Sequence, residues 1–514
     1  MNNHIFTEEH NLFRESLREF LQKEVVPNIN SWEKEKTIPK SIWKKMGDMG
    51  YLGLMYPEKY GGMELDFLYS LIYLEETAKV GSAGFAASAG VQSYMAFAHL
   101  YEAGSELLKQ KYIPGAISGD KLGALGITEP GAGSDVMSIR TSASDMGDHY
   151  LVNGSKIFIT NGYQGDFITL AVKTDPNAGI NGISLIVVDL DADGVSRTKL
   201  EKIGYHSSAT AEIFFEDVKV PKENLIGDEG HGFFYVMESF QLERLMASIG
   251  NVAACEYTID ITLQYMKERN VFGRPINKFQ VLRHRITDLY ADVEMAKTYI
   301  YQIAQAFDRK EYLVKECTIA KMKTSELAKK VADECLQMFG GFGYMDDYEI
   351  SRIYRDARVS TIVGGTTEIM AEILAKIVVD DTMYRSTYKG EAKHEVKAEI
   401  EEEFSEKPEK AIDIIRSLAN RVRKEKAHGY STVFHFDISG DNGGEFTVSL
   451  KDGICRVKDG LEGEADCKVK AKDKIYEELE LGKRNPEMAV MTGKIKISNL
   501  AEMMKFTKMF KRLF

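Results

Sequence analysis

The chain has 514 residues, too many for one ordinary hydrophobic core, so its length predicts three or four domain-sized units. Apolar residues make up 44% and charged residues 28%, which is typical of a globular protein rather than of a disordered or membrane chain. The formal net charge of −12 argues against general nucleic-acid binding, and five widely spaced cysteines without a CxxC pair suggest neither a disulfide framework nor a zinc site.

Residues 1–120 are predicted to form an all-helical domain. Apolar residues recur at helical spacing after Thr7, and the acidic pair Glu8 and Glu9 is typical of a helix N-terminus. The same spacing predicts further helices over 40–49, 68–78, 90–101 and 105–113. The first residues lack the positive start and apolar run of a secretory signal, so a cytoplasmic location is expected.

Three further regions follow. Short β-rich runs separated by Gly, Asn and Asp turns predict a compact β-domain over 121–230. Long helical periodicity predicts a helical bundle over 231–387. Residues 388–410 are charged and nearly free of aromatic residues, as in a solvated linker or an exposed helix, and they precede a last unit over 411–514.

Two motifs lie in the predicted β-domain. ITEPGAGSD, at 127–135, combines two close glycines with hydroxyl groups, so its backbone amides can approach a polar ring or a phosphate. KIFITNG, at 156–162, is a strand that can present an aromatic ring and a hydroxyl to a planar cofactor. Taken singly, the first is equally consistent with a surface turn and Phe158 with a core residue.

Three more motifs lie in the helical half. They are ERNVFGR at 268–274 with Gln280 after it, QMFGGFGY at 337–344, and YRDA at 354–357 followed by GGTTEI at 364–369. In this order and spacing the five motifs resemble those of the acyl-CoA dehydrogenases, and the resemblance extends to about residue 380.

The resemblance implies an N-terminal α-bundle, a middle β-barrel-like domain and a C-terminal four-helix bundle, with FAD between the last two. Flavin contacts are expected from Leu125, Ile127, Thr128, Ser134, Phe158, Ile159 and Thr160, of which Ser134 also contacts substrate. In the family, the adenosine and pyrophosphate end is bound by a neighbouring subunit, here through Arg269, Phe272, Gln280, Gln337, Gly340 and Gly341. Further cofactor contacts are expected from Thr366, Thr367 and Glu368. A homotetramer arranged as a dimer of dimers is therefore expected. At the position of Phe158, many members of the family carry a tryptophan.

The position of the catalytic base departs from the commonest family pattern. Many members carry a glutamate immediately before the Gly-Thr pair of the last motif, but here that residue is Gly364, which cannot abstract a proton. A subset that includes isovaleryl-CoA and long-chain acyl-CoA dehydrogenases carries the glutamate on an earlier helix, just before an arginine. Glu243 and Arg244 match that pattern, whereas without this context Glu243 would be interpreted as an exposed helix carboxylate.

The implied reaction is α,β-desaturation of an acyl-CoA thioester to a trans-2-enoyl-CoA, in fatty-acid or branched-acyl oxidation. Glu243 takes the α-proton, flavin N5 takes the hydride, and electrons pass to electron-transfer flavoprotein. The amide at Gly364 is expected to stabilise the enolate, with Gly365 beside the substrate and Arg244 binding the CoA moiety. Two alternatives stay open: an acyl-CoA oxidase, and a lipid-binding or assembly protein on a vestigial dehydrogenase scaffold.

The last unit resembles the sterol carrier protein 2 (SCP2) family. Alternating segments around Gly443-Gly444 and Asp452-Gly453 turns predict a β-meander, and the resemblance implies an α+β domain whose five-stranded sheet and helices enclose a lipid or acyl-chain tunnel. The residues that could line such a tunnel are also consistent with an ordinary core: Met488, Met491, Met503, Met504, Phe506 and Met509.

Overall fold

A computed structural model describes residues 5–382 and 408–510, except 424–426, 428–429, 452, 482, 484–488 and 490–492. The chain forms two compact units, residues 1–388 and 389–514, and each is described by itself. Residues 388–407 of the predicted linker lie outside the described residues.

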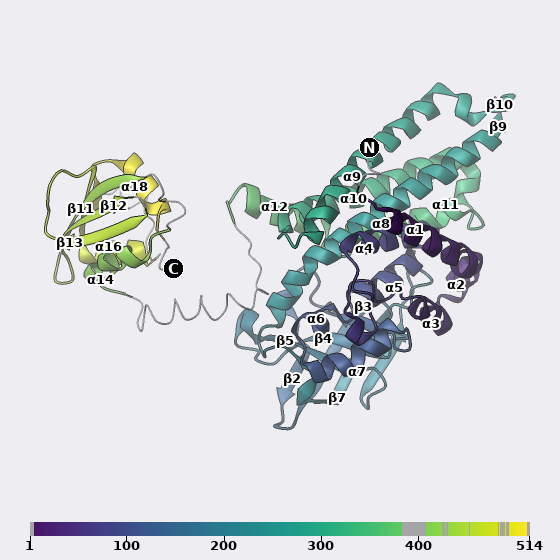
Figure 1. Cartoon of the computed structure of the whole chain (residues 1–514), viewed down its shortest axis with the longest axis horizontal. Coiled ribbons are helices and arrows are strands. Elements are labelled where there is room, and N and C mark those ends of the chain that lie inside the picture. Colours follow the sequence, from purple (N-terminus) through teal and green to yellow (C-terminus); the bar gives the residue numbers. More distant parts are fainter. Residues whose placement is uncertain are drawn as a thin grey trace. The chain divides into compact units, whose positions relative to one another are not determined.

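The first unit begins with seven α-helices in the described residues, coloured purple to blue in Figure 1. They are α1 (Glu8–Phe20), α2 (Ile29–Glu35), α3 (Lys40–Asp48), α4 (Phe67–Ala78), α5 (Ala83–Tyr94), α6 (Ala98–Ala103) and α7 (Glu106–Ile117). The Thr7 side chain accepts a hydrogen bond from the backbone N–H of His10, as predicted for a helix N-cap. The single helix predicted over 90–101 is wrong, because the chain leaves the helix after Tyr94 and starts α6 at Ala98.

The middle of the unit is an eight-stranded sheet. Its strands are β1 (Gly123–Gly126), β2 (Ser142–Asp145), β3 (His149–Ile159), β4 (Phe167–Lys173), β5 (Ile183–Asp189), β6 (Val195–Lys199), β7 (Ala211–Pro221) and β8 (Leu225–Ile226). Seven strands follow the order β6-β7-β3-β2-β4-β5-β8, and β1 pairs with β4 in parallel. Between Lys156 and Ile159, β3 carries one more residue than β7 does opposite it, which is a β-bulge.

The helical bundle completes the first unit. It comprises α8 (Gly232–Glu268), the short hairpin β9 (Asn270–Val271) and β10 (Arg274–Pro275), α9 (Gln280–Asp308), α10 (Val314–Phe339), α11 (Glu349–Ala357) and α12 (Thr367–Val378). The long helices α8, α9 and α10 run side by side, and α4 packs on α8 (Figure 1). Leu71 and Phe85 of the N-terminal helices share one apolar core with Leu245 and Met246 of α8, so helices far apart in sequence fold together.

The second unit contains a five-stranded sheet of order β13-β12-β11-β14-β15. Its elements are α14 (Ala411–Arg416), β11 (Ser431–Ser439), β12 (Gly444–Lys451), β13 (Ile454–Asp459), β14 (Cys467–Lys472), α16 (Asp473–Glu480), β15 (Ile495–Ile497) and α18 (Leu500–Lys508). The predicted meander is confirmed by the antiparallel pairs of β11, β12 and β13. Phe506 stacks on Phe434 with ring centroids 4.0 Å apart, as part of the core. Met488, Met491 and the side chain of Met504 lie outside the described residues.

The predicted fold class is confirmed: helices, a β-domain, a helical bundle and a separate α+β unit follow one another. None of the helices in the described part of the chain has the length and apolar run needed to cross a membrane. The five cysteines are free and buried, and the described residues contain no cluster of His, Cys, Asp and Glu suited to a metal ion.

Candidate active site

The expected base, Glu243, lies in the first third of α8. Its Oε1 atom is buried and has no hydrogen-bond partner among the described residues. Burial raises the pKa of this carboxyl to about 8, against the opposing effect of the neighbouring Arg244 guanidinium. A carboxylate with this proton affinity is suited to accept a proton near neutral pH.

Arg244 is buried between α8 and α10, with 7% of its surface exposed. Its Nη1 atom lies 3.3 Å from Thr318 Oγ1, and its guanidinium carbon lies 5.5 Å from the centre of the Phe240 ring. Arg244 therefore joins the segment around Glu243 to α10, and its expected contact with CoA stays a prediction.

The turn at Gly364 and Gly365 is attached to the same part of α10. Both glycines have left-handed backbone angles, φ +64° and +88°. Lys321, one helical turn after Thr318, is fully buried and donates a hydrogen bond from Nζ to the carbonyl of Gly365. The structure thus brings Arg244 and the glycine turn to one stretch of α10, and Lys321, which belongs to none of the five motifs, was missed from sequence.

The expected flavin face of the β-domain centres on the bulge of β3. Phe158 lies in the bulge with φ +62° and is 67% exposed. A left-handed backbone is costly for an aromatic residue, and such strain is concentrated at functional sites. Ile159 is 3% exposed and points into the core of the β-domain, so only its backbone is available to a cofactor.

The loop from Ile127 to Thr141 is held by a buried ion pair. Lys156 Nζ lies 2.7 Å from Glu129 Oε1 and donates a second hydrogen bond to the carbonyl of Ile127, at 3.0 Å. Glu129 also accepts hydrogen bonds from the backbone N–H groups of Arg140 and Thr141. Burial lowers the pKa of Lys156 to about 8, although the Glu129 carboxylate opposes this. Lys156 and Glu129 both lie within the β-domain motifs, but the motifs alone predicted no role for either residue.

This loop and the α8 segment that carries the base pack against one apolar cluster. Ile127 packs in the same apolar cluster as Phe240, which is three residues before Glu243. Ser134 is exposed, and a Cβ atom added at Gly131 or Gly133 would meet nothing within 4 Å, so the loop backbone is open to a ligand.

The residues expected to bind the adenosine end are exposed at the far end of α8 and α10. They are Arg269, Phe272, Gln280, Gln337, Gly340 and Gly341. The Arg269 guanidinium carbon lies 5.3 Å from the centre of the Phe342 ring, and Phe272, at the tip of the β9–β10 hairpin, is 91% exposed. Glu243 and Arg269 are 26 positions apart along α8 and its C-cap, about 39 Å at the rise of an α-helix. One chain therefore does not bring these residues to Glu243.

The described residues fit a flavin dinucleotide. Phe158 offers an exposed aromatic face, and the loop around Gly131 and Gly133 offers open backbone. The Oγ1 atom of Thr367 is buried without a hydrogen-bond partner among the described residues, as is expected of a group that awaits a polar ligand. Thr366 instead caps α12 by accepting a hydrogen bond from the Ile369 N–H, and Glu368 is exposed.

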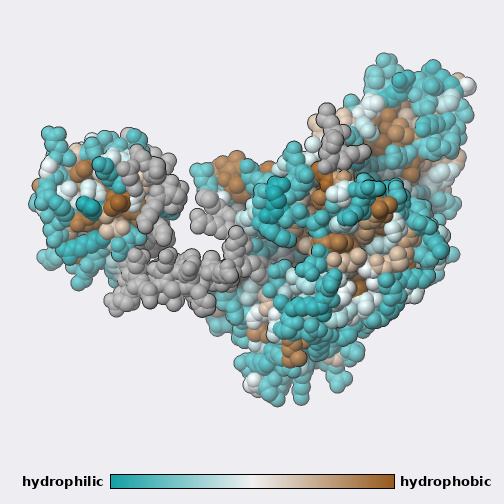
Figure 2. Space-filling model, in the orientation of Figure 1, coloured by the Kyte–Doolittle hydropathy of each residue, from teal (hydrophilic) through white to brown (hydrophobic). Residues whose placement is uncertain are grey.

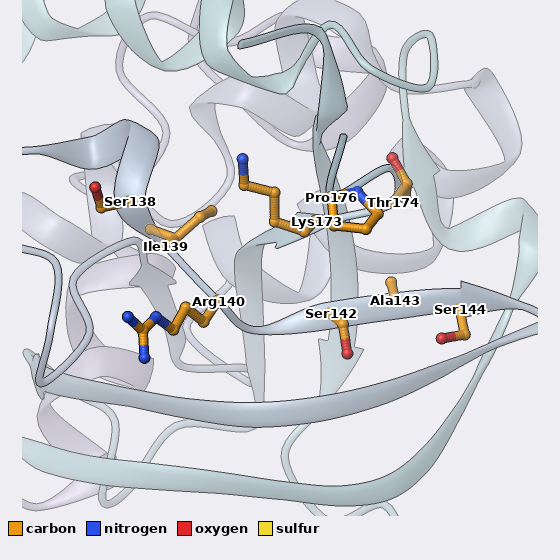
Figure 3. A pocket seen from close by; sticks show the side chains of 9 residues that line it. All are labelled: Ser138, Ile139, Arg140, Ser142, Ala143, Ser144, Lys173, Thr174 and Pro176. Atoms are coloured by element: carbon orange, nitrogen blue, oxygen red, sulfur yellow. The ribbon is translucent and has the colours of Figure 1, made fainter. Parts of the chain in front are cut away.

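A separate open pocket of about 480 Å³ lies on the β-domain (Figure 3). None of the predicted site residues lines it. Its nine lining residues come from the segment before β2, from β2, from the last residue of β4 and from the turn after it: Ser138, Ile139, Arg140, Ser142, Ala143, Ser144, Lys173, Thr174 and Pro176.

Comparisons with known proteins match the whole arrangement. Models of the N-terminal, middle and C-terminal domains of acyl-CoA dehydrogenase match residues 7–120, 124–218 and 230–379, and the SCP-2 sterol transfer family matches 413–511. The mouse mitochondrial long-chain specific acyl-CoA dehydrogenase is 38% identical over 371 residues, 72% of this chain and 86% of that protein.

The mitochondrial isovaleryl-CoA dehydrogenase of Solanum tuberosum is 35% identical over 369 residues, 71% of this chain and 89% of that protein. The crystal structure of an acyl-CoA dehydrogenase from Geobacillus kaustophilus superposes with a TM-score of 0.71 at 43% identity, covering 73% of this chain and 98% of that one. The chain therefore belongs to the acyl-CoA dehydrogenase family, FAD-dependent oxidoreductases that act on acyl-CoA, and carries an SCP2-family domain after the dehydrogenase domains.

Proposed function

We propose that the protein desaturates an acyl-CoA thioester between Cα and Cβ to a trans-2-enoyl-CoA, with Glu243 as the catalytic base. The observation that supports this most is the Oε1 atom of Glu243, which is buried and has no hydrogen-bond partner among the described residues, on a carboxyl whose pKa burial raises to about 8. It supplies an acid–base group in a chain that has Gly364 where many relatives have their glutamate.

FAD, when bound, supplies the hydride acceptor. The chain's own groups supply the rest: Glu243 takes the α-proton, and the amide of Gly364 is the proposed donor to the thioester oxygen on which negative charge develops. Burial around Glu243 keeps water from competing for that proton.

For the cofactor, we propose that two regions of the chain act in two different subunits. The flavin would be held by Leu125, Ile127, Thr128, Ser134, Phe158, Ile159, Thr160, Thr366, Thr367 and Glu368. The exposed group around Arg269 lies too far along α8 to reach the same dinucleotide, which supports binding by a partner subunit. In the helical bundle, Phe272, Met295 and Tyr344 are 91%, 66% and 88% exposed, which supports a buried interface in a homotetramer. Figure 2 shows further patches of apolar surface on the first unit.

The substrate is proposed to be a long or branched acyl-CoA, since the named mouse and potato relatives act on long-chain and isovaleryl substrates. Electron-transfer flavoprotein is the proposed electron acceptor, and the proposed process is fatty-acid or branched-acyl oxidation. A lipid or an acyl chain is the proposed ligand of the SCP2-family domain. A cytoplasmic location stays a prediction, and both of these relatives are named as mitochondrial.

An anaerobic titration of the purified flavoprotein with butyryl-, isovaleryl-, octanoyl- and palmitoyl-CoA tests the proposal. At least one of them should bleach the wild-type flavin, and Glu243→Gln should keep its FAD but be reduced more than about 100-fold more slowly. Asp260→Asn, an exposed carboxylate on the same helix, is the control and should behave as wild type.

The outcome also separates the alternatives. Unchanged reduction in Glu243→Gln would contradict the assignment of the base. Rapid reoxidation of the substrate-reduced flavin by oxygen would identify an acyl-CoA oxidase, whereas a wild-type flavin that no acyl-CoA bleaches would favour a vestigial scaffold.

A further inference from the structure

The fully buried lysine of α10, Lys321, is not explained by the proposed reaction as stated so far. Lysine is rarely buried without a partner, because removing an ammonium group from water is costly. Among the described residues, its hydrogen-bond acceptor is the carbonyl of Gly365, and it forms no ion pair within 4.0 Å. The buried Lys321 ammonium group is therefore compensated, within the described residues, mainly by its hydrogen bond to the Gly365 carbonyl.

The turn that receives this hydrogen bond has little conformational preference of its own. Gly364 and Gly365 are both left-handed, and glycine populates many backbone conformations. Two contacts fix the turn: Lys321 at the carbonyl of Gly365, and the side chain of Met370 beneath it, where a Cβ at Gly365 would come within 2.5 Å of Cε. Thr366 then starts α12 as its N-cap.

Lys321 also borders the space at Gly364. A Cβ atom added there would meet only Lys321 Cε, at 3.9 Å, so the lysine stem lies beside the position at which many relatives carry their glutamate. Burial, and after it the charge of Arg244, lowers the pKa of Lys321 to about 8, while Glu368 opposes this. At neutral pH the lysine stays mostly protonated, and hydrogen bonds from a charged donor are about twice as strong as neutral ones.

We infer that Lys321 is a positioning residue: its charged hydrogen bond to Gly365 fixes the turn so that the Gly364 amide points at the substrate's thioester oxygen. This rests on the proposed function, because it presumes that an acyl-CoA thioester reacts at this turn. The effect is on the geometry of the amide donor and not on the base, since Arg244, and not Lys321, is the charge that acts on the Glu243 carboxyl.

The test compares Lys321→Met, which keeps an unbranched side chain as far as Cε and removes the ammonium group, with wild type and with Lys323→Met. Lys323 is exposed on the same helix and pairs with Glu326. In Lys321→Met, the rate of flavin reduction at saturating acyl-CoA should fall about 10- to 100-fold, the effect of a misplaced oxyanion donor, while the half-saturating concentration changes less than about threefold. Lys323→Met should match wild type in both.

A spectroscopic readout separates positioning from general stability. The 3-thia analogue of the acyl-CoA that reduces wild type fastest cannot be dehydrogenated, but its α-carbon can ionise beside the flavin and give a long-wavelength absorbance band. With FAD content equal to wild type, Lys321→Met should show at least about fivefold less of this band at saturating analogue. An undiminished band and a reduction rate within twofold of wild type would overturn the inference.

Gly364→Ala is a second variant that tests the same turn if Lys321→Met does not fold. The added methyl group meets no atom closer than 3.9 Å, but it disfavours the left-handed backbone, so it disturbs the turn and leaves Lys321 in place. It should lower the reduction rate at least about tenfold; a wild-type rate would overturn the inference even if the proposed function holds. If no acyl-CoA reduces the wild type, the proposed function fails and the inference fails with it.

Discussion

At the scale of single residues, the Glu243 pKa of about 8 predicts how activity depends on pH. The base must be deprotonated in the free enzyme, so kcat/KM should rise roughly tenfold per pH unit below about 8 and level off above it.

The pKa of Glu243 also predicts how the stability of the fold changes with pH. Because the folded pKa is raised above 4.5, the protonated form stabilises the fold, and this stabilisation is lost as pH rises towards 8. Glu243→Gln cannot ionise, so its melting temperature relative to wild type should increase between pH 5 and pH 8. A pH-independent difference would contradict the buried carboxyl.

Glu243 was predictable from sequence because Gly364 leaves the commoner position of the base without a carboxylate, and the Glu243-Arg244 pair matches the second position. Lys321 was not predictable, because nothing in a helical repeat distinguishes a lysine that is buried from one that faces water. Lys321 and Lys323 are two positions apart on α10, yet one is fully buried and the other forms a surface ion pair. Only the packing of α10 against its neighbours decides between these environments.

At the scale of elements, the Lys156–Glu129 pair predicts the behaviour of the flavin loop. Glu129→Gln leaves a buried ammonium without its counter-charge, which typically costs about 3–5 kcal/mol of the free energy of unfolding. Because Lys156 also holds the carbonyl of Ile127, we expect the purified variant to lose most of its FAD, measured as flavin absorbance per protein. Glu216→Gln, an exposed carboxylate of β7, should retain FAD fully. A Glu129→Gln protein with a full complement of FAD would show that the loop does not need the pair.

Elements were predictable where one face of a helix or strand meets water, and not where all faces are buried. The predicted start of α1 at Thr7 is confirmed because a capping residue precedes an amphipathic run. The helix predicted over 90–101 is wrong because Tyr94, Ala96 and Phe97 are all buried, so apolar periodicity could not reveal the break between α5 and α6. The bulge at Phe158 was equally hidden, since its one extra residue appears only when β3 is paired with β7.

At the scale of the whole molecule, the two units have separate cores, which predicts that the first folds alone. Among the described residues, the apolar cluster of the second unit contains no residue from the first, and the first unit's clusters contain none from the second. A protein ending at residue 388 should bind FAD and be reduced by butyryl- or isovaleryl-CoA within about twofold of the full chain, provided wild type accepts that substrate. If the shortened protein turns over palmitoyl-CoA more slowly than the full chain but the shorter substrates equally fast, the SCP2-family domain assists the reaction of long-chain substrates. Equal turnover of palmitoyl-CoA by both proteins would exclude a role of this domain in substrate delivery.

The proposed sharing of FAD between subunits predicts complementation. Arg269→Gln removes the proposed pyrophosphate contact, and Glu243→Gln removes the base; each variant alone should be reduced poorly by acyl-CoA. In a mixed dimer, one site combines the intact Glu243 of one subunit with the intact Arg269 of the other. Random pairing makes about half of the dimers mixed, and one of the two sites in each mixed dimer is intact. About a quarter of all flavin in the coexpressed sample should therefore be reduced by acyl-CoA at the wild-type rate. If both residues instead served the same subunit's cofactor, every site would carry one defect, and the mixture would show only the average of the two variants. Lys267→Gln, exposed beside Arg269, is the matched control and should be fully reduced without a partner.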